Sequence, residues 1–212
     1  MDITIKDGYF EDPDKIRDLA LSLDNWMVSD KPNSQTSWRG ERCAPLSSYN
    51  NPELDKITQD IFDYVWAVRN LSEWRYPQWN VKDPQFASIQ NQLPDSGEGL
   101  KDPVITAHFH FTPAYVVDAF MDFWTDRFHK DFLSCAGLIY LSPDPEPESG
   151  TSILDGPNTK FVNVENVYNR LISYNGYNVH GATGCFGDTR ENSRLTLVFF
   201  INERKPYYPG KK

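Results

Sequence analysis

The stretch from Phe128 to Phe200 decides how the chain is interpreted. It consists of Phe128-His-Lys-Asp131, the apolar run Cys135-Ala-Gly-Leu-Ile-Tyr-Leu141, a separate His180, and Arg194-Leu-Thr-Leu-Val-Phe-Phe200. Residues i and i+2 of an extended segment point to the same side, so His129 and Asp131 can hold one ion together. His180 is the only His downstream of them. Two imidazoles and one carboxylate form the ligand set of a non-haem Fe(II) site with open positions.

Arg194 is the second candidate functional residue of this stretch, because it opens an otherwise apolar strand. A buried guanidinium is costly unless it meets an anion, and its fork geometry suits bidentate capture of a carboxylate. Thr196 lies two residues further on, so its hydroxyl points to the same face. We expect Arg194 and Thr196 to bind an acidic ligand.

The N-terminal part of the chain contains two helix start signals. Asp12-Pro13 and Asn51-Pro52 each combine a capping residue with Pro at the first helical position. Apolar residues follow both signals at helical spacing. This pattern predicts helices over 13–24 and from Pro52 to about residue 69, packed side by side on one face of a sheet.

Short strands dominate the rest of the prediction. Residues 28–50 are polar and aperiodic, which predicts a long loop, and 86–92 alternate in the manner of a strand. Thr112-Pro113 predicts a third helix that leads the chain to His129. The remaining strands are predicted at 3–10, 108–111, 134–141, 151–155, 160–164, 170–175 and 194–202.

These elements predict a mainly β fold with supporting helices. Many short strands separated by turns are typical of an antiparallel sandwich or barrel. A length of 212 residues fits one domain. We expect residues 1–111 to supply helical and strand support, residues 112–204 to form the core with the metal site, and residues 205–212 to be a tail.

Composition narrows the possible partners and the compartment. The 39% apolar content is typical of a globular protein, and a net charge of -9 argues against a nucleic-acid partner. Three Cys without a pattern fit reduced thiols. The sequence contains neither an apolar signal core nor a run of about 20 apolar residues. We therefore expect a cytoplasmic protein that does not enter a membrane.

Three other interpretations of the polar residues remain open. His108-x-His110 fits a cupin-type metal site but lacks the Glu of that motif, so both are expected to be pocket-rim or surface histidines. A His, Asp and His set can also hold Zn²⁺, although no general base or oxyanion donor marks a hydrolase. Arg190, within the segment 187–192, is a rival anion binder and is expected to be a solvated charge.

The order of these residues resembles one known family, the Fe(II)- and 2-oxoglutarate-dependent dioxygenases, and particularly its prolyl-hydroxylase-like branch. The residues that carry the resemblance are His129-x-Asp131, the apolar strand with Tyr140, the Gly150-Thr151 step, His180, and Arg194-x-Thr196. The similarity covers residues 128–202 and extends more loosely to the N-terminal half. It implies a double-stranded β-helix, or jelly roll, with an N-terminal helical layer.

The resemblance also implies a role for each of these residues. Iron would be held by His129, Asp131 and His180. The distal carboxylate of 2-oxoglutarate would be bound by Arg194, with assistance from Thr196 and Tyr140. The implied reaction hydroxylates a C–H bond of a peptide or protein, prolyl included, or of a small molecule, with ascorbate as a reductant. The alternative is a jelly-roll protein, cupin-like or non-catalytic, that only binds a metal or an acidic ligand.

Overall fold

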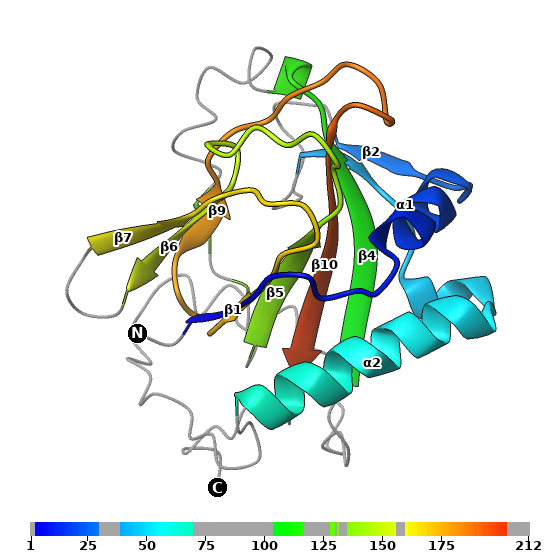
Figure 1. Cartoon of the computed structure of the whole chain (residues 1–212), viewed down its shortest axis with the longest axis horizontal. Helices are drawn as coiled ribbons and strands as arrows, with labels where there is room; N and C mark the ends of the chain where they lie inside the picture. The colour runs from blue at the N-terminus through cyan, green and yellow to red at the C-terminus, as the bar shows by residue number, and fades with distance from the viewer. Residues whose placement is uncertain are drawn as a thin grey trace, which may run out of the picture.

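The computed structural model describes residues 3–29, 39–69, 104–116, 128–129, 131, 135–155 and 160–202. Within these ranges the chain forms ten β-strands, two α-helices and one short 3-10 helix (Figure 1). The elements are β1 (Ile3–Lys6), α1 (Pro13–Leu21), β2 (Met27–Ser29), β3 (Gly40–Arg42), η1 (Leu46–Tyr49), α2 (Pro52–Val68), β4 (Val104–Thr112), β5 (Cys135–Tyr140), β6 (Thr151–Asp155), β7 (Lys160–Val164), β8 (Leu171–Tyr174), β9 (His180–Ala182) and β10 (Arg194–Asn202).

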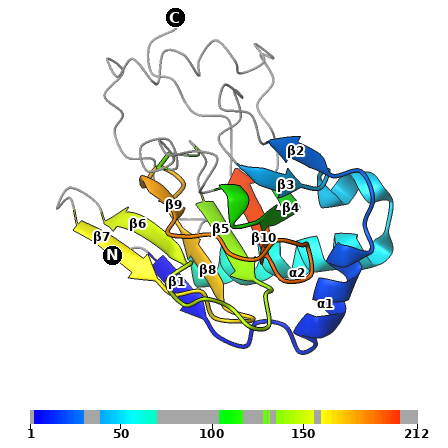
Figure 2. The same cartoon turned by 90° about the horizontal axis from the view of Figure 1, so that it is seen from above.

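The strands form two antiparallel sheets. The large sheet has seven strands in the order β1-β8-β5-β10-β4-β3-β2, and the small sheet has three in the order β7-β6-β9. Figure 2 shows the small sheet on one side of the large sheet and both helices on the other. The fold is a jelly roll with an N-terminal helical layer, as predicted.

The helical layer forms where the start signals predicted it. The Asp12 carboxylate accepts a hydrogen bond from the Lys15 amide at 3.0 Å, and the Asn51 side chain accepts one from the Glu53 amide at 2.9 Å. Lys15 and Glu53 then join the two helices by an ion pair of 2.6 Å. The apolar stripes of both helices pack on the same core of the large sheet. α1 ends at Leu21, three residues before the predicted end.

The central strand β10 separates two cores. It pairs with β4 over nine residues and with β5 over six. Leu195, Leu197 and Phe199 face the helices. Val198 faces the other way, together with residues of β5 and β8, and packs against the small sheet. We call this second side of the large sheet the inner face, because it looks toward the small sheet.

The predicted loop over 28–50 is wrong, because β2, β3 and η1 lie largely within it. β2 and β3 have only three residues each, so they show no apolar alternation, and they are held by pairing rather than by pattern. Gly40 permits the close approach of β3 to β4: its φ is +99°, and a Cβ there would lie 2.1 Å from the Phe111 carbonyl oxygen.

The strand predictions in the second half are confirmed for β5, β6, β7, β8 and β10. β4 is longer than the predicted 108–111. It extends to Thr112, so that residue ends a strand instead of capping a helix. Residues 115–116 are helical, while the rest of the predicted third helix, the strand at 86–92 and the tail at 205–212 lie outside the described residues. No helix among the described residues is long and apolar enough to cross a membrane.

Candidate metal centre and buried arginine

The candidate metal centre forms where the segment after residue 128 meets β9. The His129 amide donates to the His180 carbonyl at 3.0 Å, and the His180 amide donates back to the His129 carbonyl at 3.0 Å. The Asp131 amide donates to the Gly176 carbonyl at 2.9 Å. β9 itself is held by pairing with β6. Backbone hydrogen bonds therefore fix all three residues relative to one another.

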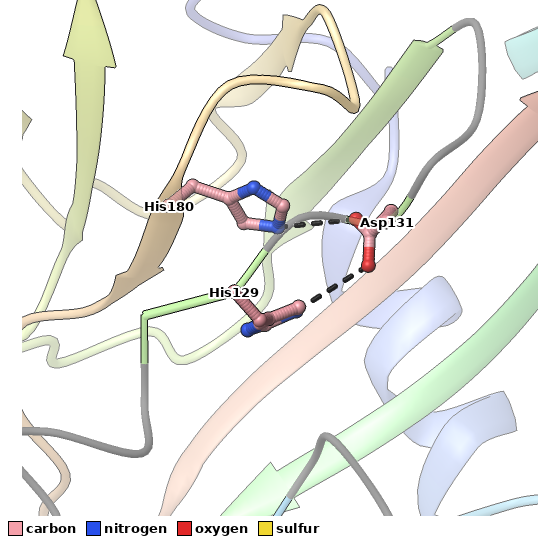
Figure 3. Close-up of side chains that lie close together, drawn as sticks. All are labelled: His129, Asp131 and His180. Atoms are coloured by element: carbon pink, nitrogen blue, oxygen red, sulfur yellow. Dashed lines mark ion pairs between the residues drawn. The ribbon is translucent and has the colours of Figure 1, made fainter. Parts of the chain in front are cut away.

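The side chains of His129, Asp131 and His180 converge on one point (Figure 3). His129 Nε2 lies 3.3 Å from Asp131 Oδ1, and His180 Nε2 lies 3.1 Å from Asp131 Oδ2. One ligand atom from each residue falls within a group no more than 4.8 Å across, and among the described residues this is the one cluster of His, Cys, Asp or Glu that could hold a metal ion. The His180 side chain is 6% exposed, and that of His129 is 30% exposed. The cluster is therefore buried on one side and accessible on the other.

The orientation of His180 is set by its neighbours. Its Nδ1 donates to the Asn178 carbonyl at 2.8 Å. Since a carbonyl can only accept, Nδ1 carries a proton, and Nε2 faces Asp131. The ring also packs on Tyr174 of β8, with 4.6 Å between the ring centroids. A hydrogen bond from one ring nitrogen to a backbone carbonyl, as Nδ1 makes here, is the usual way in which a metal-binding imidazole is oriented.

Asp131 is held as a carboxylate. Burial by itself would raise its pKa, but attraction from His180 and a hydrogen bond from His129 keep that pKa below its ordinary range. Oδ2 is fully buried and lies 3.1 Å from His180 Nε2, yet it accepts no aligned hydrogen bond from any described residue. This arrangement of Asp131 Oδ2 and His180 Nε2 fits two atoms that bind the same cation.

Arg194 is buried at the start of β10 and is only 3% exposed. Its Nε donates to the Ser149 carbonyl at 2.8 Å, and its Nη2 donates to the Gly150 carbonyl at 3.2 Å. The guanidinium carbon lies 5.5 Å from the centre of the Tyr140 ring. These contacts fix the plane of the guanidinium and use two of its five N–H groups.

Hydroxyl groups surround this buried arginine. The Tyr140 hydroxyl lies 2.8 Å from Thr151 Oγ1, and burial raises the pKa of Tyr140, so the phenol stays neutral. Thr196 Oγ1 donates to the His110 carbonyl at 3.4 Å. Thr112 stands directly opposite Arg194 in the β4–β10 register, and its buried Oγ1 has no hydrogen-bond partner among the described residues. A buried hydroxyl without a partner costs about 1–3 kcal/mol.

One row of polar residues crosses the inner face of the large sheet. In register, Tyr140 stands opposite Thr196, Thr196 opposite His110, and His110 opposite Arg42. Directly opposed residues of antiparallel strands share a face, and Tyr140 packs with the small sheet. The row therefore lines the space between the sheets, on the side where His180 contacts Tyr174.

The two histidines of β4 lie in different environments. His110 is buried on the inner face, and its Nε2 donates to the Arg39 carbonyl at 2.6 Å, so the expectation of a rim or surface position was wrong for it. His108 is half-buried, and its Nδ1 donates to the Cys43 carbonyl at 3.1 Å. Neither belongs to the one candidate metal cluster of the described ranges.

Arg190 forms an ion pair in place of the predicted solvated charge. Its Nε and Nη2 lie 2.8 and 2.5 Å from Glu41 Oε2. Its guanidinium also stacks over the Trp26 ring at 5.0 Å. Arg190 therefore ties the 187–192 segment to β3, and its charge is already matched.

Sequence reasoning missed several residues that contribute to these two groups. The missed residues are Arg42, Thr112, Tyr174 and Asn178, and the observed contacts of His110 and Thr151 were not predicted. Thr112 and His110 could have been found from the alternation of β4, had that strand been extended to its observed end. The contribution of Arg42 depends on β3, whose pairing leaves no trace in the local sequence.

Comparisons with known proteins support the fold. No family model and no curated protein matches the sequence. Among solved structures, a Pseudomonas putida prolyl-4-hydroxylase is similar over 95% of this chain and 92% of its own, with 12% identity and a TM-score of 0.52. A Trichoplax adhaerens prolyl hydroxylase, solved in complex with a hypoxia inducible factor oxygen degradation domain peptide fragment, matches over 95% and 83%, with 12% identity and a TM-score of 0.54.

A third similar structure is HygX from Streptomyces hygroscopicus with nickel and 2-oxoglutarate bound. It matches over 95% of this chain and 82% of its own, with 11% identity and a TM-score of 0.50. At these identities the similarity establishes a shared jelly-roll fold.

Proposed function

We propose that this chain is an Fe(II)- and 2-oxoglutarate-dependent oxygenase that hydroxylates a C–H bond. In this reaction a C–H group, dioxygen and 2-oxoglutarate give a C–OH group, succinate and carbon dioxide. The observation that carries the proposal is the convergence of His129, Asp131 and His180 beside an inner face that also holds the buried Arg194. The similar prolyl hydroxylase and HygX structures agree with this choice.

The three residues fit a divalent iron by their chemistry. Imidazole nitrogen and carboxylate oxygen suit Fe(II), and three ligands on one side leave positions for other groups. Asp131 is kept ionised, and the Nδ1 proton of His180 is engaged by Asn178, so Nε2 is available. Iron bound there would supply the redox chemistry that couples dioxygen to the oxidation of 2-oxoglutarate.

Arg194 is proposed to bind the distal carboxylate of 2-oxoglutarate. Two of its N–H groups are committed to the Ser149 and Gly150 carbonyls, and the others serve the carboxylate. Tyr140 and Thr196 assist, as the sequence resemblance implies, and the unpartnered hydroxyl of Thr112 adds a further donor. Burial between the sheets strengthens each of these contacts by excluding water.

The proposed substrate is a peptide or protein, prolyl residues included, or a small molecule. The Trichoplax neighbour was solved with a peptide fragment, which supports the first class. The net charge of -9 disfavours nucleic acid. Ascorbate is the proposed reductant that keeps the iron ferrous, and the proposed compartment is the cytoplasm.

Two other functions use the same residues. A zinc hydrolase would bind Zn²⁺ at the His-Asp-His cluster and would not need 2-oxoglutarate. A non-catalytic jelly-roll protein would bind metal or an acidic ligand without turnover. Arg194 favours the oxygenase, because a buried guanidinium held by the Ser149 and Gly150 carbonyls is suited to hold an anionic cosubstrate.

The test combines turnover with binding. Protein with Fe(II), ascorbate and 2-oxoglutarate should form succinate, and Mn(II)-loaded protein should be stabilised against heat by added 2-oxoglutarate. Stabilisation by Zn²⁺ but not by 2-oxoglutarate would favour the hydrolase. Binding of 2-oxoglutarate without any succinate, across a panel of peptides and small acids, would favour the non-catalytic protein.

A further inference from the structure

The turn formed by residues 175–178, between β8 and β9, contacts two of the three candidate metal ligands. The Gly176 carbonyl accepts a hydrogen bond from the Asp131 amide at 2.9 Å. The Asn178 carbonyl accepts one from His180 Nδ1 at 2.8 Å. Two backbone carbonyls of one turn therefore hold the backbone of Asp131 and the ring of His180.

This turn belongs to neither sheet. β8 ends at Tyr174 in the large sheet, and β9 begins at His180 in the small sheet. The residues between them carry the chain from one sheet to the other. Strand pairing therefore does not set the shape of the turn, which leaves it to turn and side-chain contacts.

Asn175 accepts two hydrogen bonds inside the turn. Its backbone carbonyl accepts from the Asn178 amide at 2.9 Å, which closes a four-residue β-turn. Its side-chain Oδ1 accepts from the Tyr177 amide at 3.0 Å. Asn is favoured in turns because its side chain can bond a backbone amide two residues further on. Together the two bonds fix the backbone that carries the Gly176 and Asn178 carbonyls.

A turn-forming Asn often does no more than stabilise its own loop. Here the loop that Asn175 shapes also supplies both carbonyls that orient Asp131 and His180. A change in the shape of the turn would therefore move two ligands at once. Sites of this kind need their ligands held within about 0.5 Å of the binding geometry.

We propose that Asn175 is a positioning residue of the candidate metal centre. It does not touch the ion, and it acts through the backbone of the turn, whose carbonyls set the places of Asp131 and His180. The inference rests on the proposed function, because that function assigns a metal to these ligands. Loss of a partner that orients a metal ligand typically weakens metal binding about 10–100-fold.

The first experiment measures Mn(II) affinity by calorimetric titration. Asn175→Ala removes the side-chain acceptor, so the affinity should fall about 10–100-fold. Asn175→Asp keeps an acceptor oxygen at the same place and should bind Mn(II) at least as tightly as the wild-type protein. Asn175→Ser keeps a shorter, weaker acceptor and should lie between the Ala variant and the wild-type protein.

Asn51 provides a matched control at a distance from the candidate metal centre. Its side chain accepts from the Glu53 amide, also two residues further on, at 2.9 Å. Asn51→Ala removes the same kind of hydrogen bond from the start of α2. This variant should unfold at a lower urea concentration than the wild-type protein and should keep its Mn(II) affinity.

A second measurement needs no metal and separates the turn from the added charge of Asn175→Asp. Hydrogen exchange of the Asp131 amide, followed by NMR in the metal-free protein, reports on its bond to the Gly176 carbonyl. Exchange should be at least tenfold faster in Asn175→Ala than in the wild-type protein. Asn175→Asp and Asn51→Ala should both keep the slow exchange.

Unchanged Mn(II) affinity in folded Asn175→Ala overturns the inference, and so does an equal loss of affinity in Asn175→Ala and Asn175→Asp. If circular dichroism shows that Asn175→Ala does not fold, the Ser and Asp variants decide. Equal Mn(II) affinity and equal Asp131 exchange in those two variants overturn the inference. Failure of the wild-type protein to bind Mn(II) is a distinct result, because it overturns the proposed function together with the inference that rests on it.

Discussion

His129 and His180 form a reciprocal pair of backbone hydrogen bonds, each 3.0 Å long. β5, β6, β7 and β8 lie between the two histidines in the sequence, yet this bridge brings their ring centroids to 4.6 Å. The bridge uses only backbone atoms, so it does not depend on which side chains are present. Backbone pairing thus brings two of the candidate metal ligands together.

Single replacement of either histidine should therefore remove metal binding and leave the fold intact. His129→Ala and His180→Ala should each weaken Mn(II) affinity by more than about 100-fold, beyond the 10–100-fold effect typical of residues that only orient a ligand. Calorimetric titration of Mn(II) measures the affinity, and circular dichroism checks the fold. Asn178→Ala, which keeps all three ligands, is the matched control and should have a smaller effect. Retained Mn(II) affinity in His180→Ala would place the ion elsewhere.

Arg194 should control the affinity for 2-oxoglutarate more than that for metal. Arg194→Gln removes the charge and the fork, so the affinity for 2-oxoglutarate should fall by roughly 100-fold, the equivalent of about 2.7 kcal/mol. Mn(II) affinity should change little. Arg194→Lys keeps the charge but not the bidentate geometry, so its affinity for 2-oxoglutarate should lie between those of the wild-type protein and Arg194→Gln. Heat stabilisation by 2-oxoglutarate measures the change, and an unchanged affinity in Arg194→Gln would contradict the proposed role.

Replacement of Thr112 should change stability and 2-oxoglutarate affinity in opposite directions. Its buried hydroxyl has no partner among the described residues, so Thr112→Val should stabilise the ligand-free protein by about 1 kcal/mol. The same change should weaken 2-oxoglutarate binding several-fold, because a hydrogen-bond donor is lost. Thr112→Ser, which keeps the hydroxyl, should retain binding. Urea unfolding and 2-oxoglutarate titration provide the two measurements, and a loss of stability without a loss of affinity would assign Thr112 a packing role.

Protonation of His110 should contribute to the pH dependence of the free energy of unfolding. Its pKa in the folded protein is lowered by burial, whereas in the unfolded chain it is near 6.5. Below pH 6.5 the unfolded chain takes up a proton that the folded protein excludes, so stability is complete above pH 6.5 and falls as the pH drops toward the folded pKa. The slope from this residue is at most about 1.4 kcal/mol per pH unit.

Comparison of wild-type and His110→Gln proteins isolates the contribution of His110 to this pH dependence. Both are measured without metal by urea unfolding between pH 5 and 7.5, so the contributions of the other histidines appear in each curve. The wild-type protein should lose more stability on acidification than the variant. Parallel curves would show that His110 takes up its proton in the folded state as readily as in the unfolded chain.

The helices and the central strands were predictable because their signals are local. Asp12 and Asn51 cap α1 and α2 with their own side chains, and β10 is a mainly apolar run with Arg194 at its start. The association of His129, Asp131 and His180 was inferred from residue types and from a family resemblance. Their side chains do lie together.

The missed features arise from long-range pairing. β3 consists of Gly40, Glu41 and Arg42, which carry no strand pattern and become a strand only beside β4. Thr112 looked like a helix cap because Pro113 follows it, yet the register with β10 keeps it in the sheet. Pairing across the sheet therefore overrode the local signal at both places, and it is this pairing that adds Arg42 and Thr112 to the inner face.

The alternation of β10 has a consequence for protein engineering. Residues 195, 197 and 199 are committed to the helix-covered core, whereas 194, 196 and 198 look toward the small sheet. Randomising the second set would alter the contacts proposed for 2-oxoglutarate, because Arg194 and Thr196 belong to it. A library over the first set would mostly sample unfolding. Alternate positions of one strand thus separate the residues that hold the helix-covered core from those that face the space between the sheets.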